Sequence, residues 1–214
     1  MRTLLISIST LALVLSGLAA PASAVSGTVL EEGIVFPQDP EATEFANTWG
    51  ARRSGGRRHT GSDLMAPRLT PAYAIADGTV KKMDHSRLGG WGLWIDHGDG
   101  VVSVYLHLNN DNPGTDDGRG YPEWTFAPGL EIGDEVTQGE FVAFVGDSGN
   151  AERTAPHTHF ELHVHGRKVN PYHYLKPVHD AQVTEAPTET DQPDLEVLLV
   201  KYAGVRRVSD MAPI

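Results

Sequence analysis

At residues 156–166 the chain reads PHTHFELHVHG, and this stretch decides what kind of fold to expect. Its side chains alternate in character with a period of two, which is the pattern of a β-strand buried on one face. The face expected to meet the core carries Thr158, Phe160, Leu162 and Val164. The opposite face carries His157, His159, Glu161, His163 and His165. One strand therefore presents several imidazoles and a carboxylate to a single surface.

The spacing along this strand indicates which of its histidines can share one metal site. His157 and His159 are two residues apart, ~7 Å along a strand, so one can hold a metal ion while the other acts on a ligand bound beside it. His163 lies ~13 Å from His159, which is too far for a shared first coordination shell. Paired histidines also occur by chance on surface strands, so an ordinary solvated strand face is the alternative.

Composition limits the function classes. The chain has 214 residues, no cysteine and a formal net charge of −11. This length allows one substantial domain with extensions. Without cysteine there is no disulfide, and a metal site is limited to His, Asp and Glu ligands. The acidic balance argues against nucleic acid and against an anionic membrane surface as partners.

The N-terminus has the features of an export signal. Arg2 precedes an apolar run from Leu4 to Ala20, and Ala22-Ser23-Ala24 offers the small residues that a signal peptidase reads. The apolar run is short for a transmembrane anchor, which is the alternative. We therefore expect residues 1–24 to be a cleaved signal peptide. The mature protein would then be secreted, in the cell wall or the periplasm, without a membrane anchor.

The remaining pattern is one of short alternating segments separated by Gly and Asp-Gly turns. The clearest hairpin spans residues 89–108 and turns at Gly98-Asp99-Gly100. On its returning strand we expect Val102, Val104, Leu106 and Leu108 to face the core, and Ser103, Tyr105 and His107 to face away. No long segment has a helical period. These patterns predict a mainly β, antiparallel domain.

Four regions are expected along the chain. After the signal peptide, residues 25–36 form an N-terminal extension, residues 37–175 form the β domain, and residues 176–214 form an acidic linker and tail. His179–Asp194 is rich in Pro, Thr, Glu and Asp, a composition typical of disordered segments. We therefore expect Lys176–Asp194 to be flexible and dispensable for the chemistry.

A second segment that carries chemistry, HTGSD, lies at residues 59–63. Gly61 and the following LMAP favour a loop that runs into a strand, from which His59 and Asp63 can converge. The alternative is a turn in which Asp63 or Ser62 hydrogen-bonds its own backbone. Together with His159, these two residues are candidate zinc ligands that leave a fourth position for water, whose pKa the metal lowers. His107 and His157 remain available for proton transfer and oxyanion stabilisation.

Three segments carry a family resemblance: GRRHTGSDLMAP at 56–67, YLHL at 105–108 and APHTHFEL at 155–162. They resemble the lysostaphin-like (LytM-type) zinc endopeptidases, which cut peptidoglycan cross-links, and the resemblance extends from about residue 36 to 175. It implies an antiparallel β-sheet fold of the duplicated hybrid motif or barrel-sandwich type, with the metal in a narrow groove. The zinc ligands that it implies are His59, Asp63 and His159, and the catalytic pair is His107 and His157.

The resemblance implies an exported, zinc-dependent endopeptidase whose substrate is the cross-linked peptide of bacterial peptidoglycan. The competing interpretation is a catalytically silent module of the same fold that binds peptidoglycan or activates a hydrolase. His107 and His157 favour the enzyme, because a binder needs no free imidazoles beside an open metal position. The aperiodic segment 109–129 is expected to border the groove and influence the choice of cross-link, and a purely structural cover is the alternative.

Two other protease classes are disfavoured. The sequence GDSG at 146–149 is interpreted as a turn, because the chain lacks the matching histidine segment and the disulfides of chymotrypsin-like enzymes. The helix-based zinc proteases are excluded because the sequence contains no His-Glu-x-x-His motif. Nothing in the sequence selects between glycine bridges and direct D-alanyl links as the bond that is cut.

Overall fold

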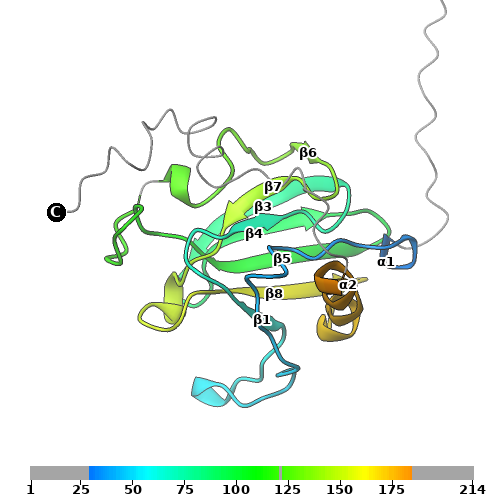
Figure 1. The fold of residues 1–214 in the computed structure, drawn as a ribbon, viewed down its shortest axis with the longest axis horizontal. Coiled ribbons are helices and arrows are strands. Elements are labelled where there is room, and N and C mark those ends of the chain that lie inside the picture. Colours follow the sequence, from blue (N-terminus) through cyan, green and yellow to red (C-terminus); the bar gives the residue numbers. More distant parts are fainter. Residues whose placement is uncertain (1–28, 121, 185–214) are drawn as a thin grey trace, which may run out of the picture.

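A single antiparallel sheet of seven strands forms the centre of the molecule (Figure 1). The computed structural model describes residues 29–120 and 122–184. Along the sheet the strands follow the order β1-β8-β5-β4-β3-β6, and β9 pairs with β8. Their bounds are β1 Ser62–Met65, β3 Gly78–Ser86, β4 Gly90–Asp96, β5 Val101–Leu108, β6 Glu135–Val136, β8 His157–Val164 and β9 Arg167–Val169.

A two-stranded sheet of β2 (Pro71–Tyr73) and β7 (Phe141–Phe144) lies apart from this path. All strand pairings are antiparallel, which confirms the predicted mainly β, antiparallel fold. The helices are α1 (Val29–Glu32), α2 (Tyr172–Thr184) and three short 3-10 helices, η1 (Ser54–Gly56), η2 (Pro122–Trp124) and η3 (Gly149–Ala151). Within the described residues, none of these helices has the length and apolar character needed to cross a membrane.

The alternation predicted for residues 157–164 is confirmed. Thr158, Phe160 and Leu162 are almost completely buried, and the ring of Phe160 packs edge-on against Tyr105 of β5 at 5.2 Å between centroids. The alternate residues point to the opposite face of the sheet. β8 lies between β1 and β5, so those residues are surrounded by the side chains of both neighbouring strands.

The faces predicted for the strand at 101–108 are wrong for Tyr105 and Leu106 and confirmed for His107 and Leu108. Val101, Tyr105 and Leu108 are completely buried in the core, whereas Leu106 lines a cavity on the opposite side of the sheet. β5 lies between β4 and β8, and a central strand that is covered on both sides does not reveal its core face by alternation. His107 also has a φ of +60°, which interrupts the alternation, so it lines the cavity beside Leu106.

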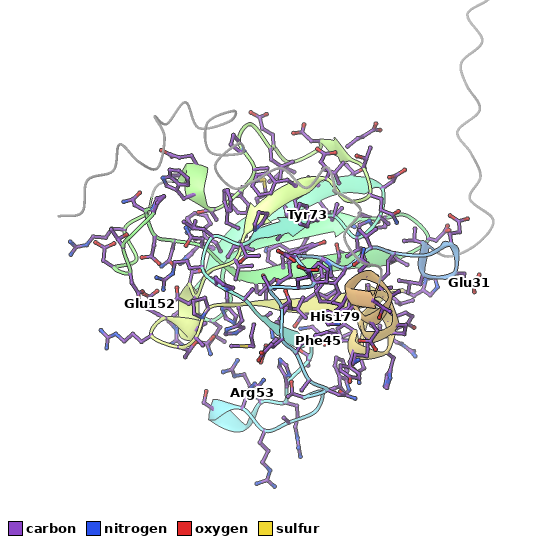
Figure 2. The ribbon with its side chains drawn as sticks, viewed as in Figure 1. Glu31, Phe45, Arg53, Tyr73, Glu152 and His179 are labelled. Atoms are coloured by element: carbon purple, nitrogen blue, oxygen red, sulfur yellow. The ribbon has the colours of Figure 1, made fainter. Side chains whose placement is uncertain are left out.

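The expectation that the chain is flexible from Lys176 onward is wrong for residues 176–184, which belong to α2. Leu175 is completely buried, Val178 packs against the core, and the ring of His179 lies 5.2 Å from that of Phe45 (Figure 2). These contacts offset the entropy of ordering that the polar composition alone would not. The rest of the predicted tail and the predicted signal peptide lie outside the described residues.

Candidate metal centre

The pairing of β1 with β8 places Asp63 directly opposite His159. Directly opposed residues of antiparallel strands project to the same face, so the carboxylate and the imidazole meet. His59 reaches them from the loop that precedes β1, as the sequence HTGSD predicted. Gly61 lets this loop approach, because a Cβ atom there would lie 2.5 Å from the Phe160 carbonyl oxygen and 2.7 Å from Nε2 of His159.

Three ligand atoms form a small triangle at this point. Oδ1 of Asp63 lies 2.9 Å from Nε2 of His59 and 2.8 Å from Nδ1 of His159, and the two nitrogens are 3.0 Å apart. A tetrahedral zinc ion bound at about 2.0–2.1 Å holds its ligand atoms about 3.3 Å apart, so a small adjustment of the side chains would admit the ion. The residues present therefore fit a divalent metal of this kind.

The far nitrogen of each imidazole is held by an outer partner. Nδ1 of His59 lies 2.9 Å from the hydroxyl of Thr48 and 3.1 Å from its carbonyl oxygen, which can only accept; with the proton on Nδ1, Nε2 presents its lone pair to the triangle. Nε2 of His159 lies 3.3 Å from Oε1 of Glu161 and donates to that carboxylate. Such outer hydrogen bonds orient the histidine ligands of metal sites.

Asp63 is ionised in this arrangement. Burial raises the pKa of its carboxyl, but the hydrogen bonds with His159 and His59 outweigh burial and hold the pKa well below its usual range. Its second oxygen, Oδ2, accepts a hydrogen bond of 2.6 Å from Nη2 of Arg53, a residue labelled in Figure 2. Arg53 thereby occupies the outer oxygen and leaves Oδ1 to face the two histidines.

Glu161 connects the centre to the rest of its strand. Besides His159, its Oε1 accepts hydrogen bonds from Thr60 at 2.8 Å and from Lys168 at 2.6 Å, and its Oε2 lies 2.8 Å from Nε2 of His163. Burial raises the pKa of Glu161, but its hydrogen bonds with the two histidines and Lys168 dominate and lower it. This buried carboxylate is therefore a fixed anion behind His159.

His107 and His157 lie beside the triangle, with their ring centroids 5.1 Å apart. Nδ1 of His107 donates to the Ser148 carbonyl oxygen at 2.8 Å, and Nδ1 of His157 donates to that of Ala155 at 2.8 Å. Both Nε2 atoms are therefore free to accept a proton, and that of His157 lies 4.0 Å from Oδ1 of Asp63. Burial, followed by the neighbouring His157, lowers the pKa of His107 to about 4.

All five residues singled out in the sequence line one cavity of about 780 Å³. The strands that contribute to its lining are β1, β3, β4, β5, β8 and β9. Its walls come from the loop before β1, which projects from the sheet in Figure 1, and from residues 150–155. His163 and His165 do not line the cavity, in agreement with their predicted separation from His159.

The segment 109–129 does not border this cavity, contrary to expectation, since none of its described residues contributes to the lining. It is held elsewhere by Arg68, which contacts Asp111 at 3.2 Å, Asp116 at 2.8 Å and Asp147 at 2.8 Å. Asp111 also accepts the backbone N–H groups of Asp117 and Gly118. The acidic residues of the segment are thus used to fold it against the strand ends.

Sequence reasoning assigned no role to Glu161 or Ser148. Glu161 carried a usable signal, because it alternates with the histidines on the same face of the strand. The contact of Arg53 with Asp63 depends on the path of an irregular loop. The Ser148 carbonyl reaches His107 across 41 residues of sequence, and no local pattern reports such a contact.

An antiparallel β domain with a His–Asp–His cluster and two further imidazoles in one cavity has the architecture of a metallopeptidase. Residues 57–117 match the model of Peptidase family M23, and with the fold this match identifies a peptidase M23 domain in the chain. The matched range includes His59, Asp63 and His107, whereas His157 and His159 lie beyond it.

Curated relatives and a solved structure show the same kinship. The DD-carboxypeptidase/endopeptidase Mpg of Neisseria meningitidis is 30% identical over 187 residues, which cover 84% of this chain and 38% of the relative. The L-Ala–D-Glu endopeptidase of Bacillus subtilis is 30% identical over 143 residues, 62% of this chain and 39% of the relative. This chain therefore spans about two fifths of the length of these relatives. A zinc-containing peptidase from Vibrio cholerae superposes with a TM-score of 0.51 and 25% identity over 64% of this chain and 38% of that one.

Proposed function

We propose that this protein is an exported, zinc-dependent endopeptidase that hydrolyses peptide cross-links of bacterial peptidoglycan. The observation that carries the proposal is the convergence of four imidazoles on one carboxylate. Each imidazole has its far nitrogen held by a separate partner: Thr48 for His59, Ser148 for His107, Ala155 for His157 and Glu161 for His159. This is the preorganisation that a metal-assisted hydrolytic site needs.

His59, Asp63 and His159 would hold the metal, and zinc suits two imidazole nitrogens and one carboxylate oxygen without cysteine. When bound, zinc supplies Lewis acidity and activates water near neutral pH. Asp63 contributes one negative charge through Oδ1, while Arg53 holds its other oxygen. The Glu161 carboxylate would orient His159 and strengthen it as a ligand.

His107 and His157 would handle protons at their Nε2 atoms. Because the pKa of His107 is lowered to about 4, its imidazole is neutral at pH 7 and can accept a proton there. Once protonated, an imidazolium can donate a hydrogen bond to the developing oxyanion or a proton to the leaving amine. The carbonyl groups of Ser148 and Ala155 keep both rings in the orientation that these transfers require.

The substrate class is supported by the relatives. Mpg is named as a DD-carboxypeptidase/endopeptidase and the Bacillus relative as an L-Ala–D-Glu endopeptidase, so related domains act on different bonds. A site outside the cytoplasm follows from such a substrate, and the predicted signal peptide at residues 1–24 is consistent with it. Nucleic acid is not proposed as a partner, because an acidic chain repels its phosphates.

Purified sacculi provide the direct test. We expect the zinc-loaded protein to release soluble peptide fragments whose masses identify the bond that is cut. Treatment with a chelator should stop the release, and added zinc should restore it. Protein that holds zinc and binds sacculi but releases no fragment would instead be the binding or activating module of the same fold.

A further inference from the structure

The cavity differs in charge from the molecule as a whole. The chain carries a formal charge of −11, but the cavity lining has more basic than acidic side chains. The basic ones are Arg53, Arg57, Arg58, Lys82 and Lys168, and the acidic ones are Asp63, Asp84 and Glu161. A concave site of one sign on a molecule of the opposite sign concentrates ligands of complementary charge.

Each carboxylate of the lining already has a cationic partner within the lining. Asp63 pairs with Arg53 at 2.6 Å. Asp84 pairs with Lys82 at 2.6 Å, and Glu161 pairs with Lys168 at 2.6 Å. Two cations, Arg57 and Arg58, are left over. Within residues 29–120 and 122–184, neither of them forms an ion pair.

The two arginines retain free hydrogen-bond donors. Among the residues that the structure describes, Arg57 donates only to Ser54, through Nε to its carbonyl oxygen at 3.1 Å and Nη2 to its hydroxyl at 3.2 Å. Arg58 donates through Nη1 to the carbonyl oxygen of Gly50 at 3.1 Å. A guanidinium has five N–H donors, so both side chains can still bind an anion, and Arg suits a carboxylate because it can donate in parallel to both oxygens.

The loop that carries them is a closed hairpin rather than a loose connection. Arg52 and Arg58 form a β-bridge, the N–H of Arg53 donates to the carbonyl of Arg57 at 2.9 Å, and the N–H of His59 donates to that of Ala51 at 2.8 Å. Arg57 and Arg58 immediately precede His59 in the chain. Their backbone positions are therefore fixed relative to the candidate metal ligand.

We propose that Arg57 and Arg58 bind a free carboxylate of the peptide substrate and so position the scissile bond over the metal centre. This inference rests on the proposed peptidase function and assigns that site a substrate class, an acidic peptide. The other cations of the lining, Arg53, Lys82 and Lys168, are each paired with a carboxylate, and the lining residues of 150–155 carry no charge, so within the described part of the chain Arg57 and Arg58 are its unpaired cations.

The test uses synthetic cross-linked peptidoglycan peptides with their free carboxyl groups left as carboxylates or made as carboxamides. For the zinc-loaded R57Q/R58Q double variant, we expect kcat/KM on the carboxylate substrate to fall roughly 10- to 100-fold, mainly through KM, as for lost hydrogen bonds to a charged group. The carboxamide substrate should be cut by the variant and the wild type at equal rates. R119Q, which removes an arginine outside the cavity, is the matched control and should behave as wild type.

A double variant that keeps the wild-type preference for carboxylate over carboxamide overturns the inference, while the proposed function stands. If zinc-loaded wild type cuts neither substrate, the proposed function fails. Binding of the same two peptides, measured by calorimetry, then decides separately on the arginines. Weaker binding of only the carboxylate peptide by the double variant supports them, and equal binding by both proteins rejects them.

Discussion

Oε1 of Glu161 lies 3.3 Å from Nε2 of His159, on the side of the imidazole ring opposite Asp63. Both ring nitrogens of His159 therefore face carboxylates. Burial lowers the pKa of His159, but the hydrogen bonds with Asp63 and Glu161 outweigh it, and the net pKa is raised. The ring is thus held in one orientation from both ends, as expected of a histidine that serves as a metal ligand.

Removal of this outer carboxylate should weaken metal binding. We expect Glu161→Ala to reduce zinc affinity about 10- to 100-fold, the usual effect of losing an outer partner of a histidine ligand. Competition with a chromogenic chelator measures this affinity without relying on activity. Glu131→Ala, at an exposed glutamate outside the cavity, is the matched control. Unchanged zinc affinity in a folded Glu161→Ala protein would show that Glu161 does not support His159.

The two halves of β8 should differ in their effect on zinc. His159→Ala removes an atom of the ligand triangle, so we expect zinc to be lost from the purified protein. His163→Ala removes only a contact to the outer oxygen of Glu161, so zinc should be retained. Metal analysis of both variants checks this difference. If His159→Ala keeps its full zinc content and His163→Ala loses zinc, the metal is bound at the His163 end of β8 and not at the His159 end.

Arg68 should be important for stability rather than chemistry. Asp147 is almost completely buried, and burial raises the pKa of its carboxyl despite the opposing effect of Arg68. Arg68→Met leaves Asp111 and Asp147 as buried acids without their cation, so we expect the free energy of unfolding to fall by about 3 kcal/mol or more. Denaturant titration measures the change.

Two further variants test the origin of that loss. Arg167→Met removes an exposed arginine from β9 and should change the free energy of unfolding by less than about 0.5 kcal/mol. Adding Asp147→Asn to Arg68→Met should recover part of the loss, because a neutral amide needs no cation. If Arg68→Met lowers the free energy of unfolding as little as Arg167→Met does, the ion pairs of Arg68 with Asp111 and Asp147 do not stabilise the fold.

His97 should make stability depend on pH. Its side chain is buried, with Nδ1 donating to the Asp77 carbonyl at 2.9 Å and Nε2 accepting from Ser103 at 2.8 Å, and burial lowers its pKa below the ordinary value of 6.5. Above pH 6.5 both folded and unfolded chains hold it neutral, so its stabilising contribution is complete. As the pH falls below that value, the unfolded chain binds a proton that the folded chain resists, and the contribution is lost.

We therefore expect His97→Gln to be less stable than wild type at pH 8 but to lose less stability between pH 8 and about 5. Thermal unfolding with a chelator present removes the separate pH dependence of metal binding. His173→Gln, at an exposed position, should follow the wild-type curve. Parallel curves for wild type and His97→Gln would rule out His97 as a source of the pH dependence.

The sequence predicted side-chain positions best in regular strands that are buried on one face only. β8 alternates between core and cavity, so Phe160 and His159 could be assigned to opposite faces from their spacing alone. β5 is covered on both sides, and Tyr105 and Leu106 were assigned to the wrong faces because hydrophobicity there does not separate core from cavity. The left-handed backbone of His107 adds a break that no residue type signals.

Long-range contacts explain the remaining differences. The polar residues of 176–184 suggested a flexible segment, but Leu175 and Val178 anchor this helix to a core that the local sequence does not show. Arg68 lies more than 40 residues from Asp111 and binds it through a fold-dependent contact, which draws the 109–129 segment away from the cavity. Arg53 beside Asp63 likewise follows from the path of a loop.

We propose that His107 and His157 perform proton transfer beside a metal that they do not bind. The most direct measurement compares zinc content and the turnover of cross-linked peptidoglycan peptides in wild type, His107→Ala and His157→Ala. We predict full zinc in both variants and turnover reduced by about 100-fold or more, the usual size for a lost acid–base group. If both variants retain zinc and cleave at the wild-type rate, His107 and His157 do not perform proton transfer in this reaction.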